Sequence, residues 1–167
     1  MFCTVLLAVV FAIAAFGKVR SASALAAFRD GLAQFGVAPS RIRRSVAGAV
    51  IAAEVGVVVL LGVAPRAGFL LAIALLVVFS AGIANALRRG VAVACRCFGS
   101  SASPIGPEHL VRNALLVAVG VLGAAGRAPS HPALEAVTAV LGALAGVLVT
   151  RWDDLVYIAR GPRRSHP

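Results

Sequence analysis

Five long apolar runs, each bounded by a basic residue or a proline, constrain this chain more than any other feature of its sequence. They cover about residues 2–17, 45–63, 67–87, 109–126 and 133–150. A helix needs about 17–25 predominantly apolar residues to cross the hydrocarbon core of a bilayer. Of the 167 residues, 60% are hydrophobic and 13% are charged, whereas soluble domains have about 45–50% and about 25%. The sequence therefore predicts an all-α, polytopic membrane bundle of five spanning helices.

A different pattern occupies residues 22–36, between the first two spans. Apolar residues recur there at steps of three and four, at Leu25, Phe28, Leu32 and Phe35, while Arg29, Asp30 and Gln34 fall on the other face. This spacing predicts an amphipathic helix over about 22–36, which we expect to lie in the membrane interface over the mouth of the bundle. We assign residues 1–160 to one domain and expect the basic residues 161–167 to form a disordered tail.

Two of the spans carry small residues at intervals of four, a spacing that lets two helix backbones approach closely. The second span has Gly48, Ala52 and Gly56, and the fifth has Gly142 and Gly146. Both ridges therefore allow close contacts with neighbouring helices.

The net charge of +10 would suggest a nucleic-acid partner in a soluble protein. No aromatic-rich basic groove accompanies this charge, so we expect no nucleic-acid partner and attribute the charge to loops that flank membrane helices. With five spans, every Lys and Arg except Arg66 and Arg127 falls on the side that holds residues 90–108 and the C-terminus. The positive-inside rule predicts that this side of a multi-pass cell-membrane protein faces the cytoplasm.

Cys95 and Cys97 lie one residue apart in a segment rich in glycine, serine and proline. On a helix their side chains would point about 200° apart, but in a loop their Cα atoms can approach to about 5.5–7 Å, which overlaps the disulfide range. Arg88, Arg89 and Arg96 favour the thiolate form. The pair is thus a candidate for redox exchange, with a soft-metal clamp or a purely structural role as alternatives. We assign no metal, because a zinc site would need two further ligands.

Several polar residues accompany the thiols at the same end of the predicted bundle. Glu54 lies within the second span, where ionisable residues are costly and are functional candidates by default; a protonated, purely structural carboxyl is the alternative. Lys18 either extends outward to the interface or pairs with Glu54. Asn85 closes the third span, and Arg112 and Asn113 open the fourth; the two asparagines are candidate helix caps as well as candidate ligands.

Taken together, these motifs resemble the methylamine utilisation protein MauE family, itself similar to the DoxX-type four-helix membrane proteins. The resemblance runs from about residue 4 to 150 and depends on Gly17-Lys18, Glu54, Asn85-x-Leu87-Arg88-Arg89-Gly90, Cys95-x-Cys97-Phe98-Gly99 and Arg112-Asn113. It implies a four-helix core to which the fifth span is added. It also implies help in maturing the small subunit of methylamine dehydrogenase, an exported, disulfide-rich client, beside a thioredoxin-like partner of the MauD type.

The residues and the resemblance together predict a thiol–disulfide electron relay, with Cys95 and Cys97 as the redox pair and Glu54 as an intramembrane acid. The supporting residues would be Lys18, Asn85, Arg88, Arg89, Phe98, Gly99, Arg112 and Asn113. The alternatives are a non-catalytic membrane scaffold for the thioredoxin-like partner and a carrier of a soft metal or small molecule. Whether the chain is itself an enzyme stays open. We assign no cofactor. Vitamin K epoxide reductase also holds a cysteine pair at one end of a small helical bundle, and this analogy leaves a quinone open. Its pair is spaced Cys-x-x-Cys, however, so its quinone chemistry cannot be carried over to this chain.

Overall fold

The structure is a computed structural model that describes residues 1–34, 36–37, 39–89, 107–126 and 132–151. Its helices are α1 (Phe2–Val19), α2 (Ala22–Gln34), α3 (Ser40–Val63), α4 (Pro65–Arg88), α5 (Pro107–Ala125) and α6 (Pro132–Thr150), and the described residues form no strand. All the helices except α2 are long and apolar enough to cross a bilayer. The prediction of an all-α polytopic membrane bundle is therefore confirmed. The tail predicted over residues 161–167 lies outside the described residues.

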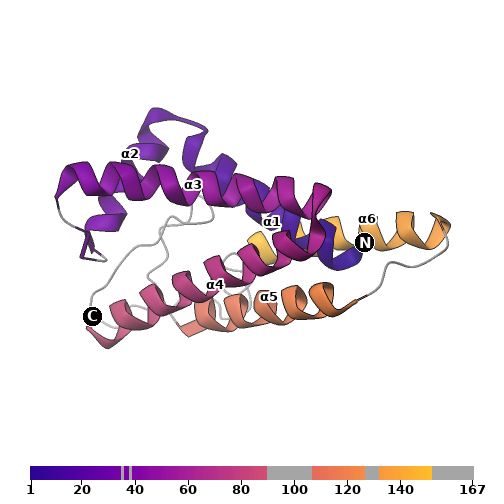
Figure 1. The fold of residues 1–167 in the computed structure, drawn as a ribbon. Coiled ribbons are helices and arrows are strands. Elements are labelled where there is room, and N and C mark those ends of the chain that lie inside the picture. The colour runs from indigo at the N-terminus through magenta and orange to yellow at the C-terminus, as the bar shows by residue number, and fades with distance from the viewer. Residues whose placement is uncertain (35, 38, 90–106, 127–131, 152–167) are drawn as a thin grey trace, which may run out of the picture.

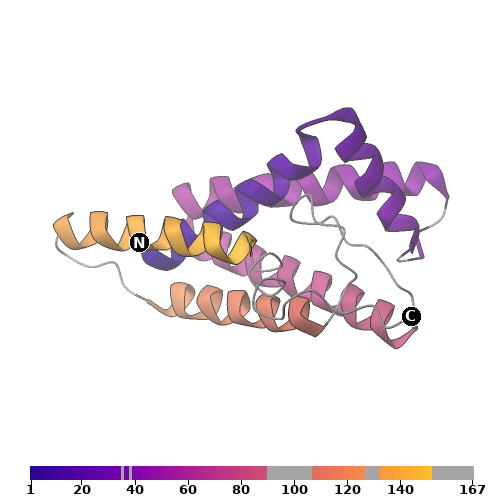
Figure 2. The same ribbon diagram turned by 180° about the vertical axis from the view of Figure 1, so that it is seen from behind.

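The helices are arranged around α1, which contacts each of the other five (Figures 1 and 2). The hairpin of α3 and α4 packs on α1, α5 packs beside α4, and α6 runs along α1 (Figure 2). Each spanning helix runs opposite to the one before it, so α1, α4 and α6 run toward the end of the bundle at which α3 and α5 begin (Figure 1). We call this the loop end of the bundle, because residues 90–106 connect α4 to α5 there.

The apolar residues divide into a buried core and an outer surface. The core joins α1, α3, α4 and α5 through Leu6, Leu7, Val10, Phe11, Val57, Leu61, Phe69, Ala72, Leu76 and Leu116. Large aliphatic side chains also stand exposed on the outside of the spans, among them Val59, Leu70, Val78, Leu122 and Leu148. So many exposed apolar side chains would be a liability in water, and they suit a surface that faces lipid.

Close backbone contact between α6 and α1 occurs where the second small-residue ridge predicts it. A Cβ added to Gly142 would lie 2.5 Å from the carbonyl oxygen of Phe2, and one added to Gly146 would lie 3.0 Å from that of Leu6. The first ridge makes no such contact. A Cβ added to Gly48 would meet no described atom of another helix within 4 Å, and one added to Gly56 would lie at an ordinary 3.7 Å from Leu71. The ridge on α3 allows a close backbone contact, but the described residues do not make one there.

Two helix boundaries differ from the sequence-based expectation. α3 begins at Ser40, five residues before the apolar run, so its first turn carries the basic residues that precede the span. A helix can continue past the hydrocarbon region because its hydrogen bonds are internal to the backbone. α2 forms as predicted but ends at Gln34, and Gly36 follows with a φ of +86°, a conformation that favours glycine. α2 packs against α1 and α3 near the loop end (Figure 1).

Candidate functional site

A buried ion pair joins α1 to α3. The Nζ of Lys18 lies 2.7 Å from Oε1 of Glu54, and the two side chains are 3% and 0% exposed. The same ammonium donates a hydrogen bond of 3.2 Å to the carbonyl oxygen of Ala14, one turn earlier in α1. Lys18 therefore turns back into the bundle, and of the two sequence-based alternatives the structure contains the pair.

The pair lies deep in the membrane-spanning region. Glu54 is nine residues before the end of α3 at Val63, a separation of about 14 Å along the helix. Lys18 occupies the last turn of α1, where the helix dipole favours a cation. Phe28 of α2 covers it, with the ring centroid 5.2 Å from Nζ, a cation–π arrangement. Unpaired charges would be costly here, so the pairing accounts for how both can be buried.

A second buried polar contact joins α5 to α4. Asn113 is 1% exposed, and its Nδ2 donates a hydrogen bond of 3.3 Å to the hydroxyl oxygen of Ser80. The Ser80 hydroxyl in turn donates a bond of 2.7 Å to the carbonyl oxygen of Leu76. Ser80 is not among the site residues predicted from the sequence, although it is the one hydroxyl residue within the apolar run of the third span.

These two contacts form one level of the bundle. Residues three or four apart lie on the same face of a helix. Phe11, Val57, Leu76 and Leu116 belong to a single packed core. On each of the four helices that carry them, one residue lies one turn nearer the loop end. It is Ala14 on α1, Glu54 on α3, Ser80 on α4 and Asn113 on α5. On α3, α4 and α5 the side chain thus changes from apolar to polar one turn nearer the loop end, while α1 contributes the carbonyl oxygen of Ala14 and the ammonium of Lys18. We call Ala14, Lys18, Glu54, Ser80 and Asn113 the polar layer.

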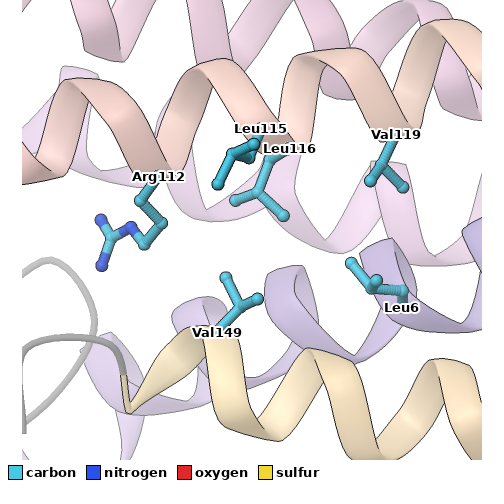
Figure 3. Close-up of a pocket in the computed structure, with 6 residues that line it drawn as sticks. All are labelled: Leu6, Arg112, Leu115, Leu116, Val119 and Val149. Carbon is cyan, nitrogen blue, oxygen red and sulfur yellow. The ribbon is translucent and has the colours of Figure 1, made fainter. Parts of the chain in front are cut away.

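Arg112 is also buried, on the α5 turn that carries Asn113, and is 4% exposed. Its aliphatic part lies at one end of a cavity of about 50 Å³ between α1, α5 and α6, whose other walls are Leu6, Leu115, Leu116, Val119 and Val149 (Figure 3). The guanidinium group points away from those aliphatic side chains (Figure 3). The cavity is therefore apolar, and Arg112 bounds it without making it a polar pocket.

The structure does not gather all the predicted site residues. Asn85, Arg88 and Arg89 are exposed at the loop end of α4, and the backbone N–H of Arg89 caps the helix by donating to the carbonyl of Asn85. Asn85 therefore does not lie among the buried polar residues around Lys18 and Asn113. A residue near the end of a helix can be buried or exposed, and the rotation of α4 leaves Asn85 exposed.

The cysteine motif itself, Cys95, Cys97, Phe98 and Gly99, lies outside the described residues. The helices on either side of it, α4 and α5, end and begin at the loop end. Within the described ranges, no three His, Cys, Asp or Glu side chains are grouped so that they could hold a metal ion.

Comparison with known proteins gives one match. Residues 1–126 match the family described as methylamine utilisation protein MauE. The searches of curated proteins and of solved structures found no match. The matched range contains α1 to α5, and with them the whole polar layer and the segment that carries Cys95 and Cys97. Since this range is most of the chain and includes every residue of the candidate site, the protein belongs to the MauE family of membrane proteins of the methylamine utilisation type.

Proposed function

We propose that this protein assists the maturation of an exported, disulfide-containing redox protein by relaying thiol–disulfide electrons at the membrane. The client would be the small subunit of methylamine dehydrogenase or an analogue of it, and the immediate partner would be a thioredoxin-like protein of the MauD type. Cys95 and Cys97 are the proposed exchanging pair. The observation that carries the proposal is the buried Lys18–Glu54 pair on the loop-end side of the apolar core.

The exchange itself requires no external oxidant. A thiolate of the pair attacks a sulfur of the partner's disulfide, forms a mixed disulfide and displaces the second partner sulfur as a thiolate. The other cysteine of the pair then attacks the mixed disulfide and releases the first partner sulfur. The dithiol of one protein becomes a disulfide while the disulfide of the other becomes a dithiol, and two protons pass between them. The reaction can run in either direction.

The polar layer supports the proton part of this exchange. Thiols must lose protons before they attack, and displaced thiolates must regain them. Glu54 carries a carboxylate 2.7 Å from a lysine ammonium, so a proton can be held on either partner of this hydrogen bond. An ionisable pair inside a membrane protein is expensive and is therefore a functional candidate. We assign it the role of holding and returning a proton during exchange.

A trapping experiment tests the relay. We expect a Cys97→Ser variant to accumulate a mixed disulfide through Cys95, or the reverse variant through Cys97, because the second cysteine is needed to resolve the intermediate. The adduct should be visible by non-reducing electrophoresis and should disappear on reduction. Cys3→Ser is the matched control, since Cys3 lies in α1 and outside the motif, and it should form no adduct.

The opposite result has a definite meaning. If the Cys95→Ser and Cys97→Ser variants form no adduct and still support normal client maturation, the pair does not exchange electrons. The protein would then act as a non-catalytic scaffold for its thioredoxin-like partner.

The side of the membrane is a separate prediction. With five spans, the sequence assigns every Lys and Arg except Arg66 and Arg127 to the side that holds the cysteine motif, and short basic loops usually stay in the cytoplasm. We therefore expect a membrane-impermeant maleimide to leave Cys95 and Cys97 unlabelled in sealed cells, even after reduction, and to label them once the cells are opened. Labelling in sealed cells, while a cytoplasmic control thiol stays unlabelled, would place the motif on the outer face.

A further inference from the structure

Two acceptor atoms in the polar layer have no donor. Oε2 of Glu54 and Oδ1 of Asn113 are buried and accept no hydrogen bond within the part of the chain that the structure describes. They belong to side chains that are 0% and 1% exposed and lie on different helices, α3 and α5. Both groups are acceptors, so what would complete them is a hydrogen-bond donor.

The neighbouring groups of the layer do not supply that donor. The Lys18 ammonium donates to Oε1 of Glu54 and to the carbonyl of Ala14, and the Ser80 hydroxyl donates to the carbonyl of Leu76. Turning the amide of Asn113 would not help. Its oxygen would then face the Ser80 oxygen, whose hydrogen is already directed at Leu76, and two acceptors would meet at 3.3 Å. The orientation with Oδ1 open is therefore the favoured one.

Leaving such acceptors unsatisfied is costly in a membrane bundle. A buried amide or carboxyl oxygen without a hydrogen bond is destabilising in an apolar environment, because it has lost its bonds to water and gained none in return. Buried polar groups of this kind are commonly completed by ordered water, which makes about three hydrogen bonds at each site. Water is also the smallest molecule that offers two O–H donors.

We propose that the polar layer is an internal hydration site that is open to water from the loop end and closed on the other side. Water molecules donate to Oε2 of Glu54 and to Oδ1 of Asn113, and they exchange protons with the Lys18–Glu54 pair. Glu54 and Asn113 hold the water, and Ser80 positions the Asn113 amide. The inference concerns the helices alone and holds whether or not the cysteines exchange electrons.

The distribution of polar residues along α5 gives the site its direction. Its buried face reads His109, Arg112, Asn113, Leu116 and Gly120 from the loop end inward. Polar side chains thus line the first part of this face, up to the polar layer. On the α4 side of the loop end Ile83 and Ala86 pack with Leu87 and Leu110 in a small apolar cluster, so water would enter along the polar face of α5. Beyond the polar layer the core is apolar on all four helices, through Phe11, Val57, Leu76 and Leu116. Water can be held by the first part and is excluded by the second, so the hydrated region should end at the polar layer.

Radiolytic labelling of the full-length protein in lipid nanodiscs, in ¹⁸O-labelled water, tests this directly. A short X-ray pulse makes hydroxyl radicals from water molecules where they are bound, so side chains beside internal water are oxidised even when buried. We expect ¹⁸O on Phe11, Leu76 or Leu116, which border the polar layer, and none on Leu61 and Phe69, which lie deeper in the same core. Mass spectrometry of peptides reads out both groups in one sample.

A variant and a matched control sharpen the test. Asn113→Leu removes one of the two acceptors, so labelling at Leu116 should fall several-fold. Thr138→Val removes a hydroxyl on α6 that is already bonded to the carbonyls of Leu134 and Glu135, and it should leave the labelling unchanged.

Two outcomes would overturn the inference. Labelling of Phe11, Leu76 and Leu116 as low as that of Leu61 and Phe69 in the parent protein would mean that no water is held, and this comparison needs no variant that folds. Equal, strong labelling of both groups would mean that the apolar core does not close the site. The parent, Cys95→Ser and Cys97→Ser proteins should label alike, so failure here and failure of the thiol relay can be told apart.

Discussion

Replacing Lys18 with Met, or Glu54 with Leu, is expected to destabilise the bundle by about 3–5 kcal/mol, whereas the double variant should unfold close to the parental midpoint. Each single change leaves one charge buried without its partner. The double change removes both charges and puts apolar side chains of similar size next to the apolar core formed by Phe11, Val57 and their neighbours. The measurement is the free energy of unfolding in detergent micelles, followed by the loss of helical signal.

Arg88→Met is the matched control for Lys18→Met. Both residues are basic and lie in the last turn of a spanning helix, but Arg88 is exposed. Its replacement should change stability by no more than about 0.5 kcal/mol. If the two single effects simply add in the double variant, Lys18 and Glu54 are not coupled and their contact has no energetic role.

The same double variant separates stability from function. It should fold, and it should fail to support client maturation, because no group in the polar layer could then hold a proton. Client maturation at the parental level in this variant would assign the ion pair to structure alone, and the thiol relay would have to work without it.

Replacing Gly142 with Leu is expected to cost about 3 kcal/mol, the upper part of the usual range for overpacking a close contact. A Cβ at this position would lie 2.5 Å from the carbonyl oxygen of Phe2, and a backbone atom inside a helix cannot move aside as a flexible side chain can. α6 would have to shift away from α1 along much of its length. Unfolding in detergent micelles measures the loss.

Gly48→Leu is the matched control, since it makes the same change on a spanning helix at a glycine with no described atom within 4 Å. It should leave the unfolding midpoint near that of the parent. Equal midpoints for Gly142→Leu and Gly48→Leu would mean that α6 does not pack on α1 as described.

The number and approximate bounds of the spans could be predicted from the sequence, because crossing a bilayer imposes a minimum length of apolar residues on each helix. The amphipathic helix α2 was predictable for a similar reason, since its spacing of three and four is a local property of the chain. The family was also recognisable, because its motifs are short strings of residues. In each case the signal lies within a few helical turns.

The site required the tertiary structure. Lys18 and Glu54 are 36 residues apart, and no periodicity relates them; they meet because α1 ends beside the middle of α3. Ser80 joined the site only because the rotation of α4 turns it toward Asn113, while the same rotation leaves Asn85 exposed.

The two glycine ridges show the distinction most clearly, because they share a spacing and have opposite outcomes. A spacing of four places small residues on one face of a helix, whatever surrounds it. Whether that face meets another helix depends on how each helix is rotated and tilted, and all of its neighbours decide this together. Gly142 lies against the backbone of α1, whereas a Cβ added to Gly48 would meet no described atom of another helix within 4 Å. From the sequence alone one can determine which residues share a face of a helix; only the packed bundle decides which of those faces is turned inward.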